Sequence, residues 1–114
     1  MNKIILKRCN RTPINLYFKQ KSGQPYNITV GHTLALTVKK SAPDDDTDIV
    51  LQKVFTGDGG NHYEIEFSAE ETDLKVGTYK YDIKDVDLKK TLNKEPIDFI
   101  ISEVVFEGNE VENE

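Results

Sequence analysis

Residues 74–84, LKVGTYKYDIK, decide the fold, because a glycine there is followed closely by a strictly alternating run. Apolar side chains stand at Tyr79, Tyr81 and Ile83, and polar ones stand between them. Alternation with a period of two predicts a β-strand that has one face toward a core and one toward water. The stretch therefore predicts a half-buried strand, which is typical of antiparallel sheets.

The same alternation recurs along the chain, and turn-forming residues separate the runs. It predicts six or seven strands, each with one face toward the core. In the other strands the inward residues are Ile14, Leu16 and Phe18, then Leu34, Leu36 and Val38, then Ile49, Leu51 and Phe55, then Tyr63, Ile65 and Phe67, and finally Ile97, Phe99 and Ile101. Lys53 is out of phase in its run. Gly57–Asn61 has the composition of a hairpin turn. We expect an all-β fold: an antiparallel two-sheet sandwich of six to eight strands.

One short helical turn is expected near residues 69–74. Ser68 is a candidate N-cap, and Glu71, three residues later, completes a capping box. Gly77 ends this segment before the alternating run begins.

Length and composition predict a single soluble domain. The chain has 114 residues, of which 37% are hydrophobic and 31% charged, as in globular proteins. We expect one domain over residues 1–107 and a mobile acidic tail over 108–114. The apolar run near the start, Ile4-Ile5-Leu6, is too short for a signal peptide, and no run approaches the length of a membrane span. Synthesis in the cytoplasm is therefore expected.

Charge is divided unevenly along the sequence. Residues 1–43 carry +8 and residues 44–114 carry −13, which gives the net charge of −5. Two interpretations stay open: the basic part of one copy steers toward the acidic part of another, or the two parts neutralise each other within one fold. The overall acidity disfavours binding to nucleic acid.

No set of residues predicts an enzyme, a metal site or a cofactor site. His32 and His62 have no catalytic or ligand spacing around them. The acidic run Asp44–Asp48 lacks the glycine and glutamate of an EF-hand loop, so calcium binding there stays an open question. Cys9 is the only cysteine, which excludes an internal disulfide. We expect an inert thiol, with pairing between chains as the alternative.

The stretch quoted first also predicts a structural corner made by Leu74, Gly77, Tyr79 and Tyr81. A turn, a glycine and a tyrosine opening a long strand are typical of the place where immunoglobulin-like sandwiches cross between sheets. There the hydroxyl of Tyr79 or Tyr81 would bond the backbone upstream while the ring packs in the core.

Three blocks of sequence resemble one family. They are Gln24–Thr29 followed by Leu34–Ser41, then Asp45–Lys53, and then Ala69–Lys84. In this order they resemble an immunoglobulin-like domain found in tail and baseplate proteins of phages of Gram-positive hosts. The likeness spans roughly residues 13–106, and departs after Asp85, where Asp87-Leu88-Lys89-Lys90 replaces a hairpin that contains glycine.

The resemblance implies a virion structural role, similar to that of the N-terminal domain of upper baseplate proteins, which attach receptor-binding proteins to the tail. We expect a non-catalytic phage or prophage adaptor, made in the host cytoplasm, whose partners are other virion proteins or further copies of itself. No nucleic acid, membrane or small-molecule substrate is expected. The candidate contact residues are Ile4, Ile5, Leu6, Val104, Val105 and Phe106. The alternative is a carbohydrate-binding or adhesion module.

Overall fold

The computed structural model describes residues 3–40, 49–93 and 95–103. Eight strands are described: β1 (Ile4–Lys7), β2 (Thr12–Tyr17), β3 (Thr33–Lys39), β4 (Ile49–Thr56), β5 (His62–Phe67), β6 (Gly77–Asp85), β7 (Lys90–Thr91) and β8 (Ile97–Ser102). The described residues form no helix, and so none that could cross a membrane. The fold is all-β.

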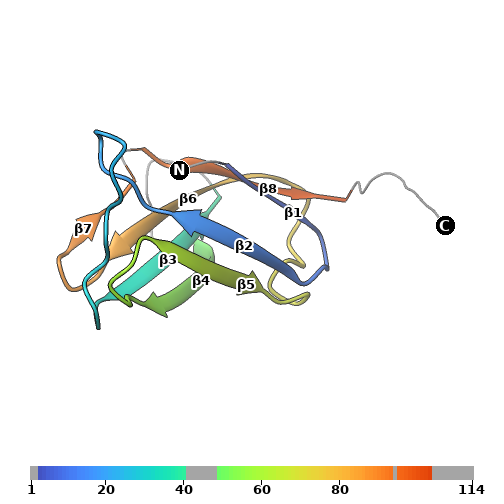
Figure 1. Ribbon diagram of the computed structural model, residues 1–114. Coiled ribbons are helices and arrows are strands. Elements are labelled where there is room, and N and C mark those ends of the chain that lie inside the picture. Colours follow the sequence, from blue (N-terminus) through green and yellow to red (C-terminus); the bar gives the residue numbers. More distant parts are fainter. Residues whose placement is uncertain (1–2, 41–48, 94, 104–114) are drawn as a thin grey trace.

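The strands form two sheets that lie against each other (Figure 1). The larger sheet has the order β1-β8-β6-β3-β4. The short strand β7 also pairs with β6. In the part of the chain that the structure describes, the smaller sheet consists of β2 and β5. Side chains from both sheets make a single buried cluster, so the arrangement is that of a β-sandwich.

The larger sheet is mixed, and the prediction of a purely antiparallel fold was wrong. β1 pairs with β8 in parallel, with Ile4 opposite Phe99 and Leu6 opposite Ile101. The other pairings are antiparallel. Alternation shows which face of a strand is buried, but it carries no information about the direction of its neighbour.

The predicted helical turn at 69–74 is absent as a helix, although its capping box is present. Ser68 N–H donates to Glu71 Oε1 (2.9 Å), and Glu71 N–H donates to Ser68 Oγ (3.1 Å). Thr72 N–H reaches Ser68 O at 3.1 Å, and the chain then leaves in a further turn.

The segment Gly57–Asn61 is a crossover between sheets, and not the predicted hairpin turn. It joins β4 of the larger sheet to β5 of the smaller one. Its glycines allow close contact with the loop before β3: a Cβ on Gly57 would lie 2.4 Å from Thr29 O. Gly59 N–H donates to Ile28 O, and Ile28 N–H donates to Gly60 O, both at 3.0 Å.

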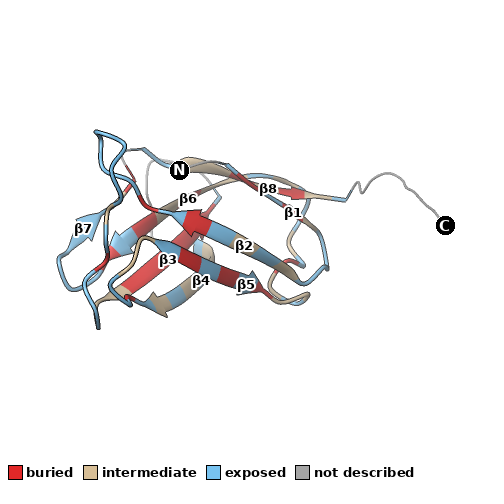
Figure 2. Ribbon diagram, in the orientation of Figure 1, coloured by how far each residue is buried: buried red, intermediate tan, exposed pale blue. Residues whose placement is uncertain are grey.

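β3 is buried on both faces, which alternation alone did not predict. Figure 2 shows burial along β3 and alternating burial along β5. Ala35, Thr37 and Lys39 point away from the core yet are less than 9% exposed. Neighbouring strands supply long side chains on that side, and Gln52 Nε2 donates to Thr37 Oγ1 at 2.9 Å. A central strand is therefore covered by its own neighbours.

Candidate partner-binding groove

Two adjoining hollows run along the outer edge of β2. The larger has a volume of about 930 Å³ and the smaller about 710 Å³, and Tyr17 and Lys19 line both. We call the two together the β2 groove. The larger hollow is lined by Tyr17, Phe18, Lys19, Gln20, Lys21, Tyr26, Lys90, Leu92, Asn93, Glu95 and Ile97, and the smaller by Lys3, Ile4, Ile5, Pro13, Ile14, Asn15, Leu16, Tyr17 and Lys19.

The groove lies beside β2 because, within residues 3–40, 49–93 and 95–103, the smaller sheet has two strands. β2 pairs with β5 on one side, and the other side of β2 faces the β1 edge of the larger sheet. Phe18 N–H donates to Asn61 O (2.8 Å), in register with the β2–β5 pairs. Because backbone groups alternate in direction along an antiparallel strand, those of Asn15 and Tyr17 point toward the groove.

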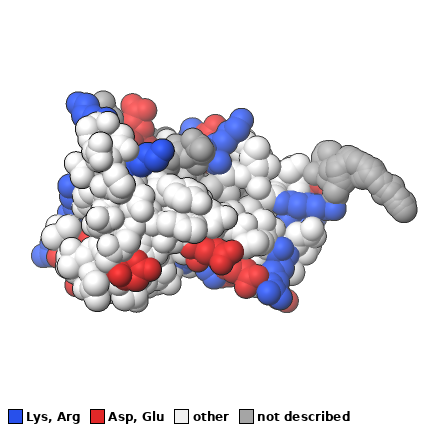
Figure 3. All heavy atoms as spheres, in the orientation of Figure 1, with Lys and Arg blue, Asp and Glu red and all other residues white. Residues whose placement is uncertain are grey.

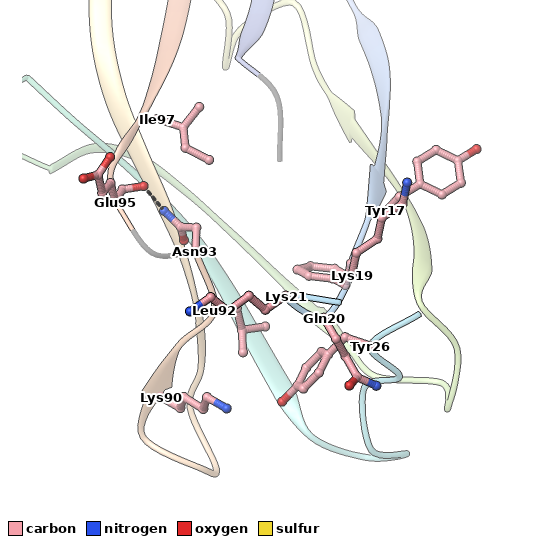
Figure 4. A pocket seen from close by; sticks show the side chains of 11 residues that line it. Tyr17, Lys19, Gln20, Lys21, Tyr26, Lys90, Leu92, Asn93, Glu95 and Ile97 are labelled. Atoms are coloured by element: carbon pink, nitrogen blue, oxygen red, sulfur yellow. Dashed lines mark hydrogen bonds between the residues drawn. The ribbon is translucent and has the colours of Figure 1, made fainter. Parts of the chain in front are cut away.

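The larger hollow has two facing walls (Figure 4). Tyr17, Lys19 and Tyr26 stand on the side of β2 and the loop after it, and Leu92 and Ile97 stand on the opposite side. Leu92, Ile97 and Tyr26 are partly buried and pack on the core. The walls are therefore apolar and aromatic near the base, with lysines around the opening.

Asn93 shapes the second wall where the chain passes from β7 to β8. Its Oδ1 accepts the N–H of Ile83 and its Nδ2 donates to Glu95 O, both at 2.7 Å. The side chain thus takes the place of a backbone carbonyl of a strand paired with β6, where the neighbouring chain is interrupted before Pro96. Leu92, Asn93 and Glu95 line the larger hollow at this interruption.

The groove carries positive charge that the described part of the chain does not neutralise. Lys3, Lys19, Lys21 and Lys90 line it against one acid, Glu95, and no ion pair is found for these four lysines among the described residues. In Figure 3 blue side chains stand out over the loop after β2. Lys90 Nζ also lies 5.5 Å from the centroid of the Tyr26 ring.

Other basic residues of the first part are paired with acids of the second. Arg8 contacts Asp73 at 3.0 Å and Glu103 at 3.5 Å, and Arg11 contacts Glu66. These contacts lie at the end of the sandwich away from the larger hollow. At this end of the molecule the basic and acidic parts neutralise each other within one fold, and steering between copies stays a prediction.

The predicted contact residues are placed unequally. Ile4 and Leu6 are 7% and 1% exposed and belong to the core, whereas Ile5 is 56% exposed. Ile4 and Ile5 both line the smaller hollow, so Ile5 remains as a surface candidate. Val104, Val105 and Phe106 lie outside the described residues, as do Asp44–Asp48 and the tail 108–114.

The corner residues occupy the start of β6. The Tyr79 hydroxyl donates to Lys75 O at 2.6 Å. Tyr81 is 1% exposed, and burial raises the pKa of its hydroxyl to about 12. Leu74 packs against the core and Gly77 begins the strand with a φ of 156°.

His32 lies beside two acids, a contact that sequence spacing did not predict. Ligand atoms of His32, Asp85 and Asp87 lie within 4.8 Å of one another, a set that could hold a cation. These atoms already bind the protein. Asp85 Oδ2 contacts His32 Nδ1 (2.9 Å), its Oδ1 accepts Leu88 N–H (3.1 Å), and Asp87 accepts Thr33 N–H (2.6 Å). The trio holds the turn after β6 against β3.

Cys9 is exposed, and its Sγ lies 3.3 Å from Asp73 Oδ1. The hydrogen bond to Asp73 raises the pKa of the thiol above its usual range. Thiolate is the reactive form, so this arrangement lowers the reactivity of the cysteine.

The groove itself was missed by the sequence analysis. Its two walls come from distant parts of the chain, since Lys19 and Lys21 follow β2 whereas Lys90 and Leu92 follow β6. The local signal for a binding site was an aromatic residue, Tyr17, close to two lysines, Lys19 and Lys21. Comparison of the sequence with known proteins finds no matching family model and no matching curated protein.

Proposed function

We propose that this protein is a non-catalytic virion structural protein of a phage or prophage, an adaptor of the tail or baseplate that joins other virion proteins through the β2 groove. The observation that carries the binding function is the free edge of β2. Its backbone groups at Asn15 and Tyr17 face an open groove whose lining combines apolar and aromatic side chains with lysines and other polar groups.

An extended peptide of a partner would pair with this edge and add a third strand to the smaller sheet. Strand addition gains affinity from main-chain hydrogen bonds and selectivity from alternating side chains. Pro13 has no N–H to offer, so pairing would be confined to the stretch from Asn15 onward. Exposed edges without a partner also favour uncontrolled association, which a dedicated partner would prevent.

The finer fold in this proposal is immunoglobulin-like. Three observations support it: a five-strand order β1-β8-β6-β3-β4, a separate β2–β5 pair, and a tyrosine at the start of β6. In immunoglobulin sandwiches the strand that carries the corner tyrosine is likewise central in its sheet, between the last strand and an earlier one. β6 has this position, between β8 and β3.

The assignment to a phage particle is supported by the resemblance of residues 13–106. Its test is mass spectrometry of particles purified from an induced source bacterium, combined with lysine cross-linking. We expect peptides of this chain in the particles, with cross-links to a tail or baseplate protein from Lys3, Lys19 or Lys21. Lys40 and Lys75, which are exposed and lie away from the groove, are the internal controls. Absence of the chain from particles, or cross-links from the control lysines alone, would contradict the proposal.

One observation favours the alternative of carbohydrate binding. Tyr17 is 53% exposed and stacks on His62 with ring centroids 4.5 Å apart, and aromatic faces of this kind stack on sugar rings. Glycan-array binding that Tyr17→Ala abolishes and Tyr17→Phe retains would establish this function in place of the adaptor role.

A further inference from the structure

We infer that the β2 groove receives the acidic segment 104–114 of a second copy, so that copies associate head to tail. This inference names the partner of the proposed binding site and therefore rests on the proposed function. It unites two features that the fold leaves separate: a basic groove with a free strand edge, and a sequence rich in acid that follows β8.

The chemistry of the segment complements that of the groove. Residues 104–114 contain four Glu and no Lys or Arg, and they begin with Val104-Val105-Phe106. The groove offers Lys3, Lys19, Lys21 and Lys90 around apolar walls. As an added strand, the segment would put Val104 and Phe106 on one face and alternate residues on the other. Its apolar start would meet the base of the groove and its glutamates the lysines.

The geometry favours a second copy over the same chain. Ile97, at the start of β8, lines the larger hollow, whereas Ser102 ends β8 beside Lys7 at the opposite end of the sandwich. Six extended residues separate these points by about 20 Å. Figure 1 shows the C-terminal end of β8 pointing away from the loop after β2. The segment therefore starts at one end of the molecule and the larger hollow lies toward the other, so a segment of the same chain would have to reverse its direction to enter that hollow.

This contact is heterologous, because the surface used on one copy differs from that used on the next. Such contacts build rings when the rotation closes and open filaments when it does not. Lysine–glutamate attraction at an exposed site is screened by salt, whose Debye length falls from about 30 Å at 0.01 M to about 10 Å at 0.1 M. Association should accordingly weaken as salt is added.

The test is sedimentation equilibrium of the full chain, over a range of concentrations, at low and at moderate salt. Three variants are compared with the unchanged protein. The groove variant is Lys19→Glu with Lys21→Glu, the segment variant is Glu107→Lys with Glu110→Lys, and the control is Lys40→Glu with Lys75→Glu, which has the same charge change as the groove variant. Circular dichroism verifies that each is folded.

We expect the unchanged protein and the control to self-associate, and the groove and segment variants each to do so about ten-fold more weakly or worse, since a few exposed charge pairs are involved. Mixing the groove variant with the segment variant should restore association, because each reversed groove then meets a reversed segment. In the same mixture the intact groove of the segment variant also meets the intact segment of the groove variant. A merely structural effect of the substitutions would restore that one contact and stop at dimers, whereas complementary charges should restore larger oligomers as well.

Two results would overturn the inference. A strictly monomeric full chain at low salt would do so, and so would association that the control weakens as much as the groove variant. Occupation of the groove by the same copy's segment would appear as the first of these, with no dependence on concentration. If the chain is monomeric but its groove is cross-linked to a different virion protein, the inference fails and the proposed function stands. If the chain forms head-to-tail oligomers but is absent from particles, the proposed function fails and the inference stands.

Discussion

Lys53 Nζ lies 2.9 Å from Glu71 Oε1, although Lys53 stands on the core-facing side of β4. The same ammonium of Lys53 lies 5.8 Å from the centroid of the Phe67 ring. Glu71 also accepts the N–H of Ser68. One carboxylate thus closes the turn after β5 and neutralises a lysine at the margin of the core, which accounts for the residue that broke the alternation of β4.

This pair predicts a dependence of stability on pH. Burial opposes the charge of Glu71, but the Ser68 N–H and Lys53 outweigh it and lower the pKa of the carboxyl. A lowered folded pKa stabilises the protein above the unfolded value of about 4.3, and this stabilisation is lost as pH falls through the folded pKa. We expect Glu71→Gln to cost about 1 kcal/mol at pH 7 and to reduce the loss of stability between pH 5 and 3, as measured by urea unfolding. Lys53→Met, which keeps the apolar stem, should change stability less than Glu71→Gln does. An unaltered pH dependence in Glu71→Gln would contradict this account.

The Tyr79 hydroxyl predicts a measurable contribution to stability. Tyr79→Phe removes the hydrogen bond to Lys75 O and keeps the ring, so we expect a loss of about 1 kcal/mol in the free energy of unfolding. Tyr17→Phe is the matched control, because Tyr17 is half exposed and should lose almost nothing. Equal effects of the two substitutions would show that the corner contact does not stabilise the fold.

Gly57 predicts a steric limit at the crossover between the sheets. Gly57→Ala would place a Cβ 2.4 Å from Thr29 O and 2.6 Å from Ile28 Cγ2, and we expect it to cost about 3 kcal/mol. Gly31 differs in kind, since its φ is +86° and nothing lies within 4 Å of an added Cβ. Gly31→Ala should cost about 1 kcal/mol, which Gly31→Asn largely recovers because Asn tolerates positive φ. Recovery by Gly57→Asn would contradict the steric explanation.

The backbone conformation of Lys89 predicts that its replacement by glycine stabilises the protein. Lys89 has a φ of 54° in the turn between β6 and β7, a conformation that favours glycine. Lys89→Gly should raise the melting temperature by several degrees, since it removes about 1 kcal/mol of backbone strain. Lys84→Gly, in the extended part of β6, should lower it. A lower melting temperature for both variants would exclude strain at Lys89.

The sequence alone determined the all-β class of the fold and much of the core. The predictions for Ile49, expected to face inward but 38% exposed, and for Ile4 and Leu6, expected as contact residues but buried in the core, were wrong. Alternation at Leu34, Leu36 and Val38, or at Tyr63, Ile65 and Phe67, specifies a buried face wherever the strand is placed, because side chains alternate across any strand. The capping pair Ser68 and Glu71 was also readable, since its contacts are three residues apart.

The tertiary structure decided everything that depends on which strands are neighbours. The parallel pairing of β1 with β8, the crossover at Gly57–Asn61 and the covering of β3 on both faces follow from contacts between distant residues. The free edge of β2 is of the same kind, because it results from a smaller sheet that stops at two strands. A pattern along one strand records which face is buried, and it leaves the partner, direction and edges of that strand to the packing of the whole chain.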